Sequence, residues 1–189
     1  MSHHPHRDSK RLPATLLVMG VSASGKTGIS RRLAKRLDRA WLDADDLHPK
    51  ANIEKMAAGF PLTDEDRWPW LDAVADWIAT QRQDGKRCVV ACSALKRVYR
   101  DRLRRADAEL LLVFLKRDRA ELEQRIRERE GHFMPPSQLD DQLATLEPPQ
   151  ADEATYEVTP KTKAKDTAKA VIKALRKRAR HAEASELEA

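Results

Sequence analysis

The octapeptide GVSASGKT at residues 20–27 constrains the fold of this chain more than any other feature of its sequence. It matches the pattern G-x-x-x-x-G-K-[ST] and directly follows ATLLVM (14–19), an apolar run with the length and composition of a buried parallel strand. Ile29, Leu33 and Leu37 then recur at helical spacing. A glycine-rich turn between a strand and a helix directs several backbone N–H groups and the helix N-terminus to one point. The segment therefore predicts a phosphate-binding loop.

Strand-like and helix-like segments alternate along the rest of the chain. Further strands are expected at 40–44, 87–93, 109–116 and near 156–158. Helices are expected around the apolar residues 71–78, at about 95–105, at 118–130, and along an apolar stripe between 168 and 179. This alternation predicts an α/β protein with a parallel, five-stranded sheet that helices cover on both faces.

The length and charge of the chain indicate one domain with basic ends. A chain of 189 residues can bury one substantial core but is too short for two ordinary domains. We expect a disordered lead at 1–13, one domain at 14–181 and a tail at 182–189. Of the net charge of +6, residues 1–13 hold +2 and residues 161–189 hold +5, which leaves −1 for the body. A basic excess in solvated ends gives no reason to expect a nucleic-acid-binding surface.

Neither hydropathy nor cysteine usage points away from the cytoplasm. No apolar stretch approaches the ~20 residues of a membrane span, and the opening MSHHPHRDSKRLP has no apolar core for a secretory signal. Cys88 and Cys92 lie in the strand-like run CVVAC, with Cα atoms about 13 Å apart at the rise of a strand, which is too far for a disulfide. We expect a cytoplasmic protein without a membrane partner, in which both cysteines are buried structural residues.

Four side chains near the loop have the chemistry of phosphoryl transfer. Lys26 would reach the β- and γ-phosphates of a nucleotide, and the Thr27 hydroxyl would bind Mg²⁺. Asp43 and Asp45 follow the second strand in LDADDLH, so one carboxylate would face the magnesium shell and the other an acceptor hydroxyl. The alternative is that these carboxylates only cap the next helix. Because the base-reading and switch motifs of GTPases are absent from the sequence, we favour a kinase.

The chain contains four blocks in a fixed order between about Leu16 and Pro149: VMGVSASGKT, LDADDLHPKANIEKMAAGFPLTDEDRWPWL, CSALKRVYRDRLR and REGHFMPPSQLDDQLATLEPP. Together they resemble the gluconokinase family, a branch of the shikimate-kinase-like and adenylate-kinase-like P-loop kinases. The resemblance implies a three-layer αβα P-loop kinase fold with a helical lid at about 118–145. The family usually has glycine at the fourth loop position, where Ala23 here adds a Cβ at the bend around phosphate.

The resemblance also implies which residues bind ATP and Mg²⁺. The ATP phosphates would be held by the loop and two lid arginines: Gly20, Val21, Ser22, Ala23, Ser24, Gly25, Lys26, Thr27, Arg125 and Arg129. Thr27 and, through water, Asp43 would hold Mg²⁺. Lys26, Asp45 and Arg129 would act in catalysis, with Asp45 orienting the acceptor hydroxyl or accepting its proton. The alternative for the arginines is an ordinary solvent-exposed helix.

A sugar-acid pocket is implied by the same resemblance. It would be lined by Asp45, His48, Asn52, Arg67, Lys96 and Arg100. Such a set suits a polyol carboxylate, because cations bind the acid end and polar groups bind the hydroxyl chain. In the alternative interpretation, Arg67 only pairs with Asp64 or Glu65, and Lys96 is a solvated helix residue. Trp68 and Trp70 are interpreted as packing residues.

The implied activity is ATP-dependent phosphorylation of D-gluconate to 6-phospho-D-gluconate, in carbohydrate acid metabolism that feeds the pentose phosphate or Entner–Doudoroff pathway, by a homodimer. One alternative is a P-loop kinase of another small acid such as shikimate, or of a nucleoside monophosphate. Another is a non-catalytic nucleotide-binding module that associates with nucleic acid through the basic segment KRARH. That second alternative leaves the Asp-x-Asp, HPKAN and SALK segments without a task.

Overall fold

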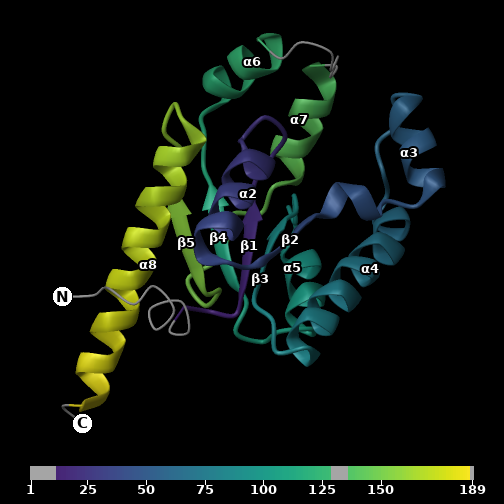
Figure 1. Ribbon diagram of the computed structural model, residues 1–189. Helices are drawn as coiled ribbons and strands as arrows, with labels where there is room; N and C mark the ends of the chain where they lie inside the picture. Colours follow the sequence, from purple (N-terminus) through teal and green to yellow (C-terminus); the bar gives the residue numbers. More distant parts are fainter. Residues whose placement is uncertain (1–11, 129–135, 188–189) are drawn as a thin grey trace.

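Five parallel strands form one sheet in the order β2-β3-β1-β4-β5 (Figure 1). The computed structural model describes residues 12–128 and 136–187. Within these ranges the predicted five-stranded parallel sheet is confirmed, and its first four strands are slightly shorter than their apolar runs. The strands are β1 (Thr15–Met19), β2 (Ala40–Asp43), β3 (Cys88–Ala91), β4 (Leu111–Leu115) and β5 (Thr155–Val158).

Helices cover both faces of this sheet (Figure 1). On one face lie α4 (Asp64–Gln83) and α5 (Arg97–Arg104), and on the other lie α2 (Lys26–Leu37) and α8 (Ala164–Leu187). The predicted three-layer αβα arrangement is therefore confirmed. Four further elements lie beyond the carboxyl ends of the strands: the 3₁₀ turn η1 (Ala44–Leu47), α3 (Lys50–Ala57), α6 (Arg119–Arg127) and α7 (Pro136–Thr145).

Alternation along β1 divides the core between the two helical layers. Leu17 and Met19 pack on the α4 and α5 side, and Leu16 and Val18 pack on the α2 and α8 side. All five residues of β1 are buried, as expected for the central strand of a sheet with two covered faces. The helical stripes predicted from the sequence are the buried faces: Ile29, Leu33 and Leu37 of α2, Leu71, Val74 and Ile78 of α4, and Ala168, Val171, Ile172 and Leu175 of α8.

The strand order brings the conspicuous motifs of the sequence to one edge of the sheet. β1 lies between β3 and β4, so the chain order reverses on either side of it, and crevices of α/β sheets form at such a point. The carboxyl ends of β1, β2 and β3 open at the same edge because the strands are parallel. Residues 20–27, η1 and residues 92–96 therefore meet there.

The ends of the chain and the lid are described only in part. The expected lead lies outside the described residues up to residue 11, and so does the middle of the expected lid, at 129–135. Residues 182–187, expected as a tail, continue α8 as helix. The segment HAEASELEA is rich in alanine and glutamate, which favour helix, so continuation of α8 agrees with its composition.

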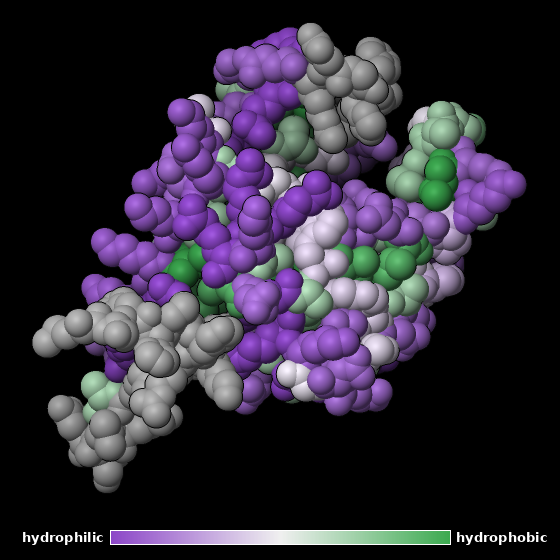
Figure 2. Space-filling view, viewed as in Figure 1, coloured by the Kyte–Doolittle hydropathy of each residue, from purple (hydrophilic) through white to green (hydrophobic). Residues whose placement is uncertain are grey.

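Two further expectations concern the cysteines and the surface. Cys88 and Cys92 are buried and free, which confirms that they do not pair. In the described part of the chain, no helix is long and apolar enough to cross a membrane. Figure 2 shows a largely hydrophilic face with apolar surface in several places, one of them over α3, where Ile53 is exposed.

Candidate active site

The loop between β1 and α2 has the backbone conformation that its glycines allow. Gly20 has φ +144° and Gly25 has φ +101°. A Cβ at Gly20 would lie 2.9 Å from the carbonyl oxygen of Leu115, so the neighbouring strand leaves no room for a side chain. Ala23, the departure noted in the sequence, also has a positive φ of 61°, a conformation that glycine adopts without cost. The loop thus follows the tight path expected of a phosphate-binding turn.

The polar side chains of this loop, Lys26 and Ser24, are placed where they could bind an anion. Lys26, the first residue of α2, donates from Nζ to the carbonyl oxygen of Val21 at 3.0 Å, and so lies along the loop. The Ser24 hydroxyl is buried without a hydrogen-bond partner in the described structure. Because buried hydroxyls are normally paired, this group has unused capacity beside the predicted phosphate position.

Two arginines from the β4–α6 region, Arg117 and Arg125, donate hydrogen bonds to carbonyl oxygens of the loop. Arg125 donates from Nε to the Ala23 carbonyl oxygen at 2.7 Å, and Arg117 donates to the Ser24 carbonyl oxygen at 3.2 Å. Burial and, second to it, the charge of Arg117 lower the pKa of Arg125, while Glu121 and Glu128 oppose this shift. Sequence reasoning singled out Arg125 but missed Arg117, whose signal was its place just after the fourth apolar run.

Thr27 and Asp43 form a corner at the ends of β1 and β2. The Thr27 hydroxyl donates to Oδ2 of Asp43 at 2.8 Å, and Oδ1 of Asp43 accepts from the backbone N–H of Asp45 at 3.4 Å. The capping alternative is thus realised for Asp43 without excluding a second role. A hydroxyl and a carboxylate suit Mg²⁺, which keeps several waters and takes one or two carboxylates plus phosphate oxygens.

Asp45 and His48 lie together after β2, at opposite ends of η1. Asp45 Oδ1 is 4.0 Å from His48 Nε2. Partial desolvation by the surrounding walls raises the pKa of Asp45; Lys26 opposes this effect, and Asp43 and Asp46 add to it. The pKa of His48 is lowered to about 4, first by burial and then by Arg67, so its imidazole is neutral at pH 7.

The His48 ring is held in place by two neighbours. It stacks on Trp70 with ring centroids 4.3 Å apart, and the Trp70 indole N–H donates to the Ala44 carbonyl oxygen at 2.7 Å. Asn52 Nδ2 donates to the Asp66 carbonyl oxygen at 2.8 Å and lies 3.5 Å from His48 Nδ1. Because an amide nitrogen only donates, this contact favours the tautomer with its proton on Nε2, facing Asp45.

A cationic cluster surrounds Asp64 in the first turn of α4. The Lys96 ammonium donates to both Asp64 oxygens at 2.8 Å, the Tyr99 hydroxyl also donates to Asp64, and Arg67 lies 3.8 Å away. The Lys96 and then the Tyr99 hydrogen bonds lower the pKa of Asp64. A capping box between Thr63 and Asp66 begins the helix here. Two cations share one carboxylate, so the cluster keeps a net positive charge.

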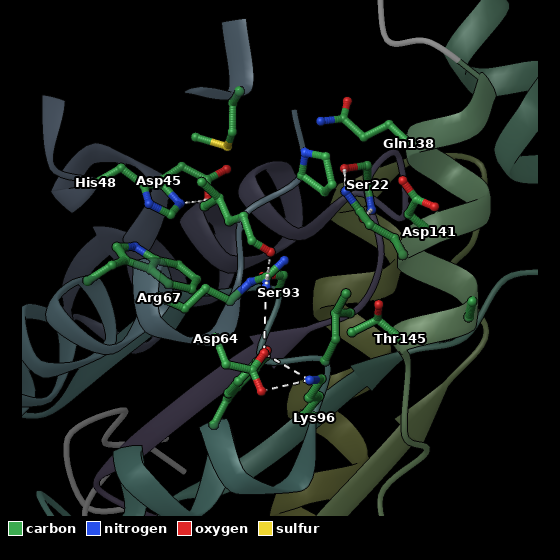
Figure 3. A pocket seen from close by; sticks show the side chains of 18 of the residues that line it. Ser22, Asp45, His48, Asp64, Arg67, Ser93, Lys96, Gln138, Asp141 and Thr145 are labelled. Carbon is green, nitrogen blue, oxygen red and sulfur yellow. Dashed lines mark hydrogen bonds and ion pairs between the residues drawn. The ribbon is translucent and has the colours of Figure 1, made fainter. Parts of the chain in front are cut away.

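These groups surround one hollow of about 840 Å³ (Figure 3). Of the predicted site residues beyond the loop, the hollow is lined by Asp45, His48, Arg67 and Lys96, and from the loop by Ser22, Ala23 and Lys26. Asn52 and Arg125 are not among the lining residues: Asn52 contacts His48, and Arg125 donates to the Ala23 carbonyl oxygen. The opposite wall is formed by α7, through Gln138, Asp141, Gln142 and Thr145, none of which was predicted.

Arg100 was expected in the pocket, but its side chain lies behind the hollow, fully buried. It forms a two-point ion pair with Glu153 at 2.7 and 2.8 Å and donates to the carbonyl oxygens of Ala94, Leu95 and Glu147. A guanidinium that satisfies this many acceptors is fixed, because five donors in one plane leave little freedom. Arg100 thus braces the loop after β3, next to Lys96. Arg129, the remaining predicted residue, lies outside the described residues.

The fold and the site define a class of protein. A phosphate-binding loop leads from β1 into α2, a threonine–aspartate corner stands beside it, and a separate polar hollow adjoins both. A family model described as an AAA domain matches residues 16–149. This protein is a small P-loop kinase.

Comparison with individual proteins narrows the class. The chain is 49% identical over 147 residues to the gluconokinase of Gluconobacter oxydans (strain 621H), covering 78% of this chain and 83% of the relative. It is 45% identical to the thermoresistant gluconokinase of Escherichia coli (strain K12), covering 72% and 78%. The crystal structure of a gluconokinase from Sinorhizobium meliloti 1021 matches with a TM-score of 0.82 and 39% identity, over 93% of this chain and 98% of that one. The chain belongs to the gluconokinase family, which confirms the resemblance drawn from its motifs.

Proposed function

We propose that this protein transfers the γ-phosphoryl group of ATP to the primary hydroxyl of D-gluconate, giving 6-phospho-D-gluconate and ADP. The observation that carries the proposal is the single hollow that adjoins Lys26 and the phosphate-binding loop and also contains Asp45 and the cationic cluster around Asp64. One cavity can therefore hold a nucleotide phosphate and a polyol carboxylate at the same time. The relatives named as gluconokinases support this substrate over other acids.

The donor half of the site would be the loop with Lys26 and the predicted lid arginines, Arg125 and Arg129. Backbone N–H groups of residues 20–27 would cradle the phosphates, and Lys26 would turn from the Val21 carbonyl oxygen to the β- and γ-phosphates. Arg125 and Arg129 would neutralise charge that develops on the transferred group. Thr27 and, through water, Asp43 would hold Mg²⁺, which supplies further charge neutralisation when bound.

The acceptor half would be organised by Asp45. As the acceptor oxygen forms its bond to the γ-phosphorus, the bond from phosphorus to the bridging oxygen of ADP breaks, and the hydroxyl proton passes to the Asp45 carboxylate. The raised pKa of Asp45 favours this role because a stronger base accepts the proton more readily. Neutral His48, with its Nε2–H toward Asp45, would hold the acceptor hydroxyl beside that carboxylate without adding a charge.

The acid end of gluconate would face the Asp64 cluster. Lys96 and Arg67 line the hollow and outnumber the one carboxylate between them, so an incoming carboxylate meets a net positive charge. Figure 3 shows Lys96 and Asp64 at one end of the hollow, with Asp45 and Ser22 toward the other. An extended six-carbon acid would then place its far hydroxyl near Asp45 while its carboxylate is held at the opposite end.

We also propose that the enzyme works in the cytoplasm as a homodimer, as the family resemblance implies. Light scattering after size exclusion, over a range of protein concentrations, measures the assembly. A mass of about twice the 21.5 kDa chain supports the dimer, and a mass equal to one chain contradicts it.

The substrate is tested by measuring ADP release from Mg·ATP with D-gluconate, other aldonates, shikimate and nucleoside monophosphates. We expect rapid turnover with D-gluconate and at most slow turnover with shikimate or nucleotides. Efficient turnover of another acceptor in place of gluconate contradicts the substrate assignment but retains a kinase. ADP release with no acceptor dependence contradicts phosphoryl transfer to an acid altogether.

A further inference from the structure

Helix α7 turns one polar face toward the hollow. Gln138, Asp141, Gln142 and Thr145 recur at i, i+3, i+4 and i+7, which places them on one side of a helix, and all four line the cavity (Figure 3). Gln138, Asp141 and Thr145 lie across the hollow from Asp45 and His48. This wall contains amide, carboxylate and hydroxyl groups in a row along the cavity.

The position of this helix is fixed from its other side. Leu139 of α7 is 2% exposed and belongs to a small apolar cluster with Val21, Leu95 and Leu122. Val21 is a loop residue, and Leu95 precedes Lys96. The packing thus ties α7 both to the phosphate-binding loop and to the segment that leads to the cationic cluster, which orients its polar face toward the space between them.

Gln142 joins this polar face to the phosphate-binding loop directly. The Ser22 backbone N–H donates to Gln142 Oε1 at 2.7 Å, and Gln142 Nε2 donates to the Ser22 hydroxyl at 2.9 Å. A reciprocal pair of this kind fixes both the rotation and the distance of α7 relative to the loop. The remaining polar side chains are then held at the border between the two halves of the site.

We infer that α7 is the wall that recognises the hydroxyl chain of the acceptor and so sets the choice among sugar acids. The inference rests on the proposed function. All three of Gln138, Asp141 and Thr145 line the hollow, and their side chains form no hydrogen bond with another residue in the ranges 12–128 and 136–187. Hydroxyl groups both donate and accept, and amide, carboxylate and hydroxyl side chains match them.

The charge on this wall also sets the orientation of the acceptor. Asp141 accepts hydrogen bonds from hydroxyls but repels a carboxylate, whereas Lys96 and Arg67 attract one. An aldonate therefore binds with its acid end at the Asp64 cluster and its hydroxyls along α7. A sugar acid with one inverted hydroxyl leaves a polar group of this wall unpaired, which lowers its affinity.

The adjacent residue provides a matched control. Asp140 points away from the hollow and pairs with Arg119 of α6 at 2.6 Å. Asp140→Ala and Asp141→Ala make the same chemical change at neighbouring positions of one helix, yet only the second removes a group from the cavity. A difference between the two variants therefore reports on the wall rather than on helix propensity or net charge.

The test compares wild type, Asp141→Ala, Thr145→Val and Asp140→Ala in steady-state kinetics with D-gluconate, D-mannonate and D-galactonate. We expect Asp141→Ala and Thr145→Val to raise KM for gluconate about five- to tenfold, as for the loss of one or two hydrogen bonds, and to leave KM for ATP within about twofold. The ratio of kcat/KM for gluconate to kcat/KM for each epimer should decrease in both variants. Asp140→Ala keeps wild-type values.

Other outcomes separate this inference from the proposed function. The inference is wrong if the wild type turns over gluconate but Asp141→Ala and Thr145→Val keep the wild-type KM for gluconate and the wild-type preference for gluconate over its epimers. In that case α7 does not recognise the acceptor. A rise in KM for ATP that equals the rise for gluconate also overturns the inference, because it assigns the wall to the nucleotide. Melting temperatures check folding, and Gln138→Ala repeats the test on the same face if Thr145→Val lowers stability. A wild type inactive with gluconate contradicts the proposed function instead.

Discussion

At the scale of single residues, the chemistry of the site depends on the protonation states of Asp45 and His48. Asp45 and His48 lie 4.0 Å apart, and their surroundings disfavour the charged form of each. Desolvation is the main cause for both, so the carboxylate becomes a better base while the imidazole stays neutral. The two groups therefore do not form an ion pair. Asp45 can accept the proton of an acceptor hydroxyl while neutral His48 forms a hydrogen bond to that hydroxyl.

The role of Asp45 is tested by Asp45→Asn. The amide keeps the shape of the side chain but accepts a proton poorly, so we expect kcat to fall about 10²- to 10⁴-fold while ATP binds as tightly as before. Single-turnover kinetics and ATP titration give the two quantities. Asp46→Asn makes the same change at the next residue and removes only the smallest contribution to the Asp45 pKa, so its turnover should stay close to wild type. Near-normal kcat in Asp45→Asn would show that no base is needed at this position.

The neutral state of His48 predicts a loss of stability in mild acid. Its pKa is about 4 in the folded protein and about 6.5 when unfolded, so the unfolded chain binds more protons between these values. Stability present above pH 6.5 is therefore lost as the pH falls, by about 2 kcal/mol between pH 7 and pH 5. Urea unfolding of wild type and His48→Gln measures this. An equal pH dependence in both proteins would contradict the assignment.

At the scale of elements, loops after parallel strands hold the chemistry while the strands fix their positions. The loop after β1 is limited by β4, whose last residue Leu115 faces Gly20. The loop after β3 is braced by Arg100, which reaches Glu153 before β5. Each catalytic segment is therefore held by a neighbouring strand or by a segment adjoining one.

The close approach at Gly20 predicts a large effect of a single methyl group. Gly20→Ala combines a positive φ with a contact of 2.9 Å to backbone, so we expect a loss of about 3 kcal/mol or more in stability and weaker ATP binding. Gly59→Ala is the control, because Gly59 also has a positive φ but nothing within 4 Å of a built Cβ; it should cost only about 1–2 kcal/mol. Equal losses in chemical denaturation would show that packing against Leu115 is unimportant.

The Arg100 brace predicts a loss of stability rather than of binding alone. Arg100→Met leaves the Glu153 carboxylate buried beside fewer partners, which should cost about 3–5 kcal/mol. Adding Glu153→Leu should recover part of this loss, and urea unfolding of both variants measures it. Unchanged stability in Arg100→Met, together with a rise in KM for gluconate, would instead assign Arg100 to the substrate pocket.

Local patterns predicted the strands, the helical stripes and the phosphate-binding loop, because each depends on residues close in sequence. The hollow was predicted in part: the motif after the second strand indicated Asp45, and the family resemblance added His48, Arg67 and Lys96, which also line it. The positions of other groups depend on partners far along the chain. Lys96 meets Asp64 across 32 residues, and Arg100 meets Glu153 across 53, so no local pattern shows that one lines the hollow and the other lies behind it. The α7 wall escaped prediction for the same reason.

At the scale of the whole molecule, the hydrophobic core and the candidate active site occupy different parts of the sheet. The two helical layers and the amino ends of the strands hold the core, and the carboxyl ends present the loop, η1 and the cationic cluster to one hollow, closed from the opposite side by α7 (Figures 1 and 3). The excess of basic residues lies at the two ends of the chain, outside the segments that form the site. The central claim is that the hollow binds ATP and a sugar acid together, so that the γ-phosphoryl group is transferred to a single hydroxyl of the acid.

The most direct test of that claim is ³¹P NMR of a reaction that contains the enzyme, Mg·ATP and D-gluconate. We predict one new phosphomonoester, coupled to the protons of C6 and formed in equal amount to ADP, and no such signal when gluconate is omitted. A phosphate on another carbon would contradict the orientation in which the acid end binds Lys96 and Arg67. Release of inorganic phosphate alone would contradict transfer to the acid.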